Sequence, residues 1–108
     1  MALQVAELSF ELIEVVRAAA EKIRRRDRSL ADQLVRAASS VALNLAEGNW
    51  SDDGNRRARF HTAAGSASET AAALRVGVGR GYLAPADVAA ADQLVRRIIA
   101  ILAKLTRG

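Results

Sequence analysis

The chain has 108 residues and is 51% hydrophobic but only 4% aromatic, which favours one all-helical domain spanning residues 1–108. It has no cysteine, which excludes a disulfide framework and a thiolate metal site, and its N-terminus lacks the basic region of a signal peptide. No apolar run reaches the roughly 18 residues of a membrane span, and the net charge of +4 is weak support for a nucleic-acid partner, so we expect a cytoplasmic protein with no membrane partner.

The first predicted helix runs from about Gln4 to Arg25, because apolar residues recur there at helical spacing. Phe10 and Ile13 fall outside the apolar stripe, and they either pack at the rim of the subunit or contact another subunit. The helix ends in a cluster of four arginines within five positions, namely Arg24, Arg25, Arg26 and Arg28. Cations stabilise a helix C-terminus, but four arginines are more than this stabilisation requires. The cluster is either a solvated turn or a phosphate site.

The second predicted helix ends at Gly48 and is apolar around most of its circumference, so it should be buried on most sides. Ser29 is its expected N-cap, with Asp32 three residues later as in a capping box. Gly48 is expected to be the left-handed residue that closes the helix. Asn44 lies on the apolar seam, where its amide must find a partner or destabilise the fold.

The loop after Gly48 carries Trp50, the only tryptophan. We expect its ring to cover apolar surface at the end of the domain, and stacking on a nucleobase is the alternative. Asp52 or Asp53 is expected to cap the next helix.

The third predicted helix runs from about Asn55 to Arg80, and its small seam residues with Gly65 allow a neighbour to approach closely. Its first turn carries three arginines, which oppose the helix dipole and call for either a functional role or salt bridges: Arg56, Arg57 and Arg59. Glycines end this helix. They do not form a phosphate loop, because no strand precedes them and no Lys-Ser/Thr follows.

The fourth predicted helix opens with Pro85 near its first position. Short connections at all three turns predict an antiparallel four-helix bundle with up-down-up-down topology. Its core should include Leu34, Val41, Leu74, Val95 and Ile98. The second and fourth helices carry more apolar surface than one bundle covers, which predicts a closed homo-oligomer.

Three groups of residues carry a family resemblance: Gln33-Leu34, Arg36-Ala37-Ala38, Ser40-Val41 and Asn44-Leu45-Ala46-Glu47-Gly48; then Gly65-Ser66 with Glu69; then Gly81-Tyr82-Leu83. They resemble the motifs of the bacterial four-helix bundle proteins, also known as 23S rRNA intervening-sequence proteins. The resemblance implies a four-helix bundle, a homopentameric ring and a link to nucleic acid. Relatives include the accessory protein of diversity-generating retroelements, which works with a reverse transcriptase and RNA.

The polar residues of these motifs favour a buried network that fixes helix register over catalysis. The candidates are Asn44, Glu47 and Glu69, with Arg36 or Ser40 as a further member. Gly48 and Ser66 belong to the same structural motifs. His61 has no cysteine or second histidine to complete a metal site, and the surroundings of Ser66 lack the nucleophile-elbow pattern. We therefore predict no enzyme, no metal, no cofactor and no small-molecule substrate.

Antiparallel topology places Arg24–Arg28 with Arg80 at one end of the bundle, and Arg56, Arg57 and Arg59 near Arg107 at the other. A ring would repeat each cluster into a basic collar that contacts the phosphates of RNA or DNA without sequence preference. Sequence-specific reading of single strands is not expected, because aromatics are scarce apart from Trp50 and Tyr82. The Arg24–Arg28 end is preferred, since Asp52 and Asp53 can neutralise the other. The alternative is a protein-binding scaffold without nucleic acid.

Overall fold

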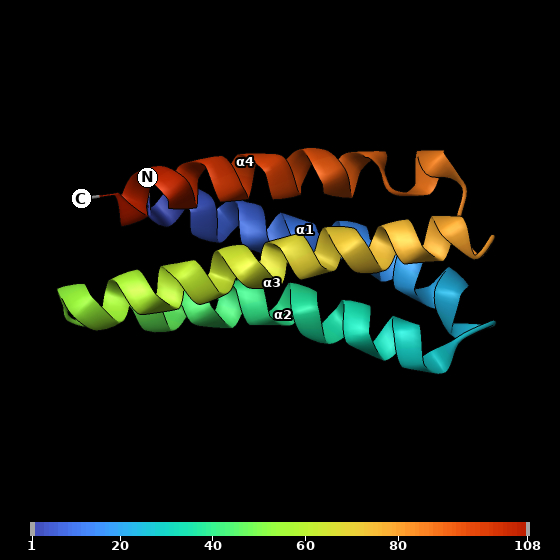
Figure 1. Ribbon diagram of the computed structural model, residues 1–108, viewed down its shortest axis with the longest axis horizontal. Helices are drawn as coiled ribbons and strands as arrows, with labels where there is room; N and C mark the ends of the chain where they lie inside the picture. The colour runs from blue at the N-terminus through green and yellow to red at the C-terminus, as the bar shows by residue number, and fades with distance from the viewer. Residues whose placement is uncertain (1, 108) are drawn as a thin grey trace.

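The computed structural model describes residues 2–107 and contains four α-helices and one short 3₁₀ helix. Their bounds are α1 Ala2–Arg24, α2 Arg28–Asn49, α3 Asp53–Gly79, η1 Pro85–Asp87 and α4 Ala89–Thr106. Consecutive α-helices run antiparallel along one long axis (Figure 1), and each packs against the next, with α4 returning to α1. The predicted four-helix bundle with up-down-up-down topology is therefore confirmed, and no strand occurs in the part of the chain that the structure describes.

The core runs along the axis of the bundle and takes aliphatic side chains from all four α-helices. The residues predicted for it are all buried: Leu34, Val41, Leu74, Val95 and Ile98. The seam of α3 is buried as well, and it consists of small residues between two large ones, Phe60, which is 1% exposed, and Leu74, which is 0% exposed. Phe60 therefore fills most of the space at its end of α3.

The helix starts confirm one predicted cap and correct another. Asp52 caps α3, since its Oδ1 accepts from the backbone N–H of Asn55 at 3.0 Å. The cap of α2 is Asp27 rather than Ser29, because the Asp27 carboxylate accepts from the N–H of Leu30 at 3.0 Å. Asp27 also binds Arg80 from the end of α3 at 2.9 Å. The carboxylate thus serves two contacts at once, which a serine hydroxyl would not do as strongly.

Two glycine predictions are corrected by the structure. Gly48 does not end α2 in a left-handed conformation, because the helix continues to Asn49, and the only positive φ within residues 2–107 belongs to Gly81, at 80°. Gly48 is instead a place of close approach, where a Cβ would lie 2.6 Å from the Phe60 ring. Gly65 has open space around it, so it brings no neighbour close. Gly77 does, since a Cβ there would lie 3.0 Å from Leu83.

Two further expectations fail at the turns. Trp50 is 93% exposed, so its ring does not cover the end of the bundle. Pro85 begins η1 rather than the fourth α-helix, and α4 starts at Ala89. The fixed φ of proline suits the first residue of a helix of either kind, which is why the sequence pattern does not distinguish them.

The apolar surplus is exposed on α2 but not on α4. Val35 and Leu43, two turns apart on α2, are 40% and 64% exposed, and Phe10 on α1 is 53% exposed. The wide stripe of α4 is instead half-buried against the core, through Leu94, Ile99 and Ile101. The surface that a monomer would expose is thus centred on α2. Within the described residues, no helix has both the length and the hydropathy that a membrane crossing requires.

Candidate functional site

The first arginine cluster lies where α1 turns into α2, at the right in Figure 1, together with the end of α3 as predicted. Two of its guanidinium groups are held by carboxylates: Arg24 Nη1 lies 2.7 Å from Asp32 Oδ1, and Arg80 Nη1 lies 2.9 Å from Asp27 Oδ2. Within residues 2–107, no ion pair involves Arg25, Arg26 or Arg28. We call these three residues the α1–α2 cluster.

The carboxylates at this end are held in their charged form. The backbone N–H of Leu30 lowers the pKa of Asp27, and the Arg80 guanidinium lowers it further. The Arg24 guanidinium lowers the pKa of Asp32 in the same way. Both carboxylates therefore stay ionised near neutral pH and keep their arginines occupied, whereas the α1–α2 cluster faces solvent.

The second arginine cluster lies at the opposite end, where α2 turns into α3 (Figure 1). Arg59 is held there, because its Nη1 lies 2.8 Å from Glu47 Oε2. Within the described chain no ion pair involves the other three arginines of this end, Arg56, Arg57 and Arg107, which we call the α2–α3 cluster. They line a cleft of about 420 Å³ with Phe60 and Leu105 as apolar walls, and Asp53 is the only carboxylate in its lining.

The two ends of the bundle differ less in the neutralisation of their arginines than the sequence suggests. Asp52 does not neutralise an arginine, because its carboxylate caps α3 and accepts from the Asn55 side chain at 3.3 Å. The acidic residues that neutralise arginines are Asp27, Asp32 and Glu47, and two of these three lie at the α1–α2 end. Asp53 lines the cleft of the α2–α3 cluster but forms no ion pair within residues 2–107. The preference for the Arg24–Arg28 end therefore has no ion pair in its support.

The structure brings several motif residues together into one polar network between α2 and α3. The Asn44 amide donates to the carbonyl and the hydroxyl of Ser40 at 2.9 and 3.0 Å, and the Ser40 hydroxyl lies 2.8 Å from that of Ser66. Arg59 Nη1 donates to Asn44 Oδ1 at 3.3 Å and so joins Glu47 to the network. Of its members, Ser66 is buried, Ser40 and Asn44 are half-buried, and Glu47 and Arg59 are exposed. The network is thus partly in solvent rather than buried as predicted.

Arg59 is the member of this network that the sequence assigned to another role, as a phosphate ligand. Arg59 and Asn44 are almost equally distant in sequence from the turn at Trp50–Asp52. Aligning the two helices of this antiparallel hairpin about the turn would therefore have predicted the contact between these two residues. Arg36 and Glu69, also expected in the network, are exposed. They lie outside it.

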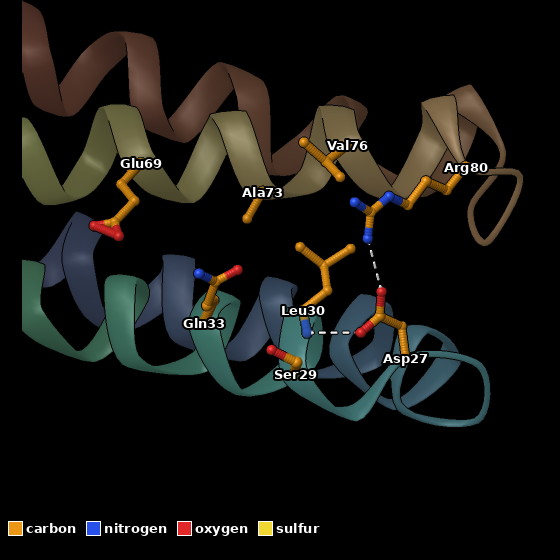
Figure 2. A pocket seen from close by; sticks show the side chains of 8 residues that line it. All are labelled: Asp27, Ser29, Leu30, Gln33, Glu69, Ala73, Val76 and Arg80. Atoms are coloured by element: carbon orange, nitrogen blue, oxygen red, sulfur yellow. Dashed lines mark hydrogen bonds and ion pairs between the residues drawn. The ribbon is translucent and has the colours of Figure 1, made fainter.

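Glu69 belongs to a separate cleft of about 420 Å³ between α2 and α3. Figure 2 shows Glu69 and Gln33 reaching into this space, with Leu30 among the apolar side chains beside them and the Asp27–Arg80 pair at the far side. Because Arg80 is occupied by Asp27, the cleft offers a carboxylate and an amide but no available cation. It suits a hydrogen-bond donor better than a phosphate.

Metal binding finds no support in the described residues, which contain no group of three His, Asp or Glu side chains placed to hold an ion. His61 is exposed on α3.

Comparisons with known proteins agree with the fold. A family model described as 23S rRNA-intervening sequence protein matches residues 1–104. A crystal structure from Bacteroides thetaiotaomicron, described as a protein with unknown function from the S23 ribosomal protein family, is similar with a TM-score of 0.88 and 15% sequence identity, covering 96% of this chain and 99% of that one. At this identity the likeness concerns the fold alone. No curated protein matches the chain. The family match extends over nearly the whole sequence, and the chain therefore belongs to the 23S rRNA-intervening sequence protein family.

Proposed function

We propose that this protein is a non-enzymatic nucleic-acid-binding protein that contacts phosphates, those of RNA above all, through arginines at the ends of its bundle. The observation that carries the proposal is that each end has three arginines outside the ion pairs of the described chain, all of them exposed except the half-buried Arg56: the α1–α2 cluster and the α2–α3 cluster. The planar guanidinium matches phosphate geometry. RNA as the partner and the cytoplasm as the location are part of this proposal.

Such contacts make binding depend on salt rather than on sequence. Each phosphate neutralised by an arginine releases counterions, so the logarithm of affinity falls with the logarithm of salt concentration by about 0.7 per contact for a single strand. Phosphate contacts carry no sequence information. The expected behaviour is broad binding that is strong at low salt and weak at high salt.

A salt titration of RNA and DNA binding tests this function. We expect the Arg25→Ala/Arg28→Ala and Arg56→Ala/Arg57→Ala variants each to bind more weakly than wild type, with slopes shallower by about 1.4 where both arginines contact single-strand phosphates. The first pair avoids Arg24, which holds Asp32, and Arg26, which lies over the Tyr82 ring. Arg56 of the second pair lies over the Phe60 ring in the same way, so this variant is compared only after its circular dichroism and thermal melt are shown to match wild type.

The matched control is Arg96→Ala/Arg97→Ala, which removes the same charge from exposed positions in the middle of α4. It should keep most of the affinity and the wild-type slope. Absence of binding at about 50 mM salt, where phosphate contacts are strong, would contradict the function and favour the scaffolding alternative. A control that loses as much as the cluster variants would show attraction to net charge alone.

We further propose that the protein forms a closed homo-oligomer, with five copies as the family resemblance implies. Its support is the outer face of α2, where Val35 and Leu43 are exposed and flank Ser39. Shallow grooves of about 350 and 380 Å³ lie on the two sides of this ridge, towards α1 and towards α3. A ridge beside grooves can pack against another copy, and a ring would repeat each arginine cluster around its axis.

Light scattering coupled to gel filtration tests the assembly. We expect wild type to elute with several times the mass of the 11.5 kDa chain, and Leu43→Glu to elute as a monomer, because it places a charge on the α2 ridge. The control is Leu3→Glu, which makes the same change at a position that is 81% exposed near the start of α1. It should leave the mass unchanged. A monomeric wild type at micromolar concentration would contradict the assembly.

The scaffolding alternative keeps one observation in its favour, the same exposed ridge of α2. On this alternative the protein is a protein-binding or scaffolding oligomer, and the wild type binds neither RNA nor DNA at about 50 mM salt, where phosphate contacts are strong. The salt titration above therefore separates the alternatives.

A further inference from the structure

Aromatic side chains are few in this protein, and three of the four are not available to a ligand rich in phosphate. Phe60 is 1% exposed. Tyr82 is half-buried, and the Arg26 guanidinium covers its ring at 5.4 Å from the centroid. Phe10 is half-exposed, but its neighbours on α1 are exposed acids that repel phosphate, namely Glu7, Glu11 and Glu14.

Trp50 differs from the others because its backbone is fixed while its ring lies in solvent. Its N–H donates to the carbonyl of Glu47 at 3.2 Å, and the next residue, Ser51, donates from N to Gly48 O at 3.2 Å and from Oγ to Glu47 O at 2.7 Å. The ring is nevertheless 93% exposed. The turn thus holds a large flat apolar group outside the fold, at a defined place.

The end of the bundle that carries Trp50 holds both cations and carboxylates. Of its carboxylates, Glu47 is paired with Arg59, Asp52 caps α3, and Asp53 lines the cleft of the α2–α3 cluster. The α2–α3 cluster lies at the same end of the bundle, and the Arg56 guanidinium lies over the Phe60 ring at 5.5 Å. That ring packs against Gly48, two residues before Trp50. An exposed indole at the same end of the bundle as arginines without ion pairs is a combination by which proteins bind single-stranded nucleic acid, through stacking on a base and contact with phosphates.

We propose that Trp50 is a base-stacking site for single-stranded nucleic acid, whose phosphates contact Arg56 and Arg57. A duplex is a poorer ligand here, because its bases already stack on one another and only the terminal faces are open. A second copy of the chain is a poorer occupant, because it would bring its own arginines to a basic end. Stacking accepts any base, so the site selects single strands without selecting sequence. The inference rests on the proposed function and identifies the end that carries it.

The experiment uses Trp50 as its own reporter, since it is the only tryptophan. Full-length protein is titrated at about 50 mM salt, where phosphate contacts are strong, with a short oligouridylate and, separately, with a duplex RNA of the same length. We expect the single strand to quench Trp50 fluorescence at saturation and the duplex to leave it nearly unchanged.

Variants separate stacking from charge. Trp50→Ala should lower the affinity for the single strand by about tenfold or more and keep the salt slope, and Trp50→Phe should restore part of the affinity. Arg56→Ala/Arg57→Ala should make the slope shallower and still show quenching at saturation. Trp50 and Arg57 are exposed, and Arg56 is half-buried over the Phe60 ring. Circular dichroism should confirm that each variant keeps the helical content of wild type.

The outcomes distinguish this inference from the function on which it rests. No binding of any nucleic acid overturns both. Salt-dependent binding with unchanged Trp50 fluorescence and a wild-type affinity for Trp50→Ala overturns the stacking site alone. Fluorescence that changes on dilution of the protein but not on addition of RNA shows a second copy on Trp50 and also overturns it.

Discussion

We expect the Val41→Asp variant to lose cooperative folding. Val41 is fully buried in α2, within the apolar cluster that joins the four helices. An ionised carboxylate there would have lost its water without gaining a partner, and an uncompensated buried charge destabilises a fold by about 3–5 kcal/mol. That loss approaches the whole stability of a small domain, about 5–15 kcal/mol. Circular dichroism on heating should show reduced helicity and no sharp transition.

The control for this variant is Val76→Asp, the same change on α3 at a side chain that is 40% exposed. The new carboxylate can keep much of its water there, so the variant should remain helical and unfold cooperatively within a few degrees of wild type. A Val41→Asp variant with full helicity and a normal melt would show that the assigned apolar seam of α2 is wrong.

The fold was predictable because each helix repeats its apolar residues at a spacing that only a helix can bury on one side. Val41 and Leu74 lie on such stripes, and both are fully buried. Three short connections then leave few ways to pack four helices. The positions of the arginines at the two ends followed from the same topology.

The ion pairs at those ends were not predictable in the same way. Arg80 meets Asp27 from 53 residues away, so the pair depends on how the ends of α1 and α3 are aligned. The sequence therefore predicts which arginines lie at each end, but it does not predict which of them are paired with a carboxylate. The structure shows that three of these arginines are held in ion pairs, namely Arg24, Arg59 and Arg80.

Trp50 shows a second limit of sequence reasoning. A lone indole in a short turn was expected to cover apolar surface, as most large apolar rings do. Phe60 already fills the space at that end of α3, at 1% exposure, and the hydrogen bonds of Trp50 and Ser51 to α2 fix the turn without using the ring. The indole is therefore left in solvent, outside the packed end of the bundle.

The same crowding around Phe60 makes Gly48 a sensitive position. A methyl group added at Gly48 would lie 2.6 Å from Phe60 Cε1 and 2.9 Å from Cδ1. The ring is buried and lies beneath the Arg56 guanidinium, so it cannot turn aside without disturbing its other contacts. Overpacking of this kind costs about 1–3 kcal/mol, against a gain of up to about 1 kcal/mol from replacing glycine by alanine within a helix. We expect Gly48→Ala to lower the unfolding free energy.

Gly65→Ala is the matched control, because Gly65 is an exposed helical glycine around which a Cβ meets nothing within 4 Å. The unfolding free energy of this variant should rise by up to about 1 kcal/mol, because alanine has a higher helix propensity than glycine. The difference between the two variants, measured by denaturant unfolding at one protein concentration, isolates the overlap with Phe60 and should be about 1–3 kcal/mol. If Gly48→Ala proves as stable as Gly65→Ala, the ring moves without penalty, and the glycine is not required for the close approach of α2 to α3.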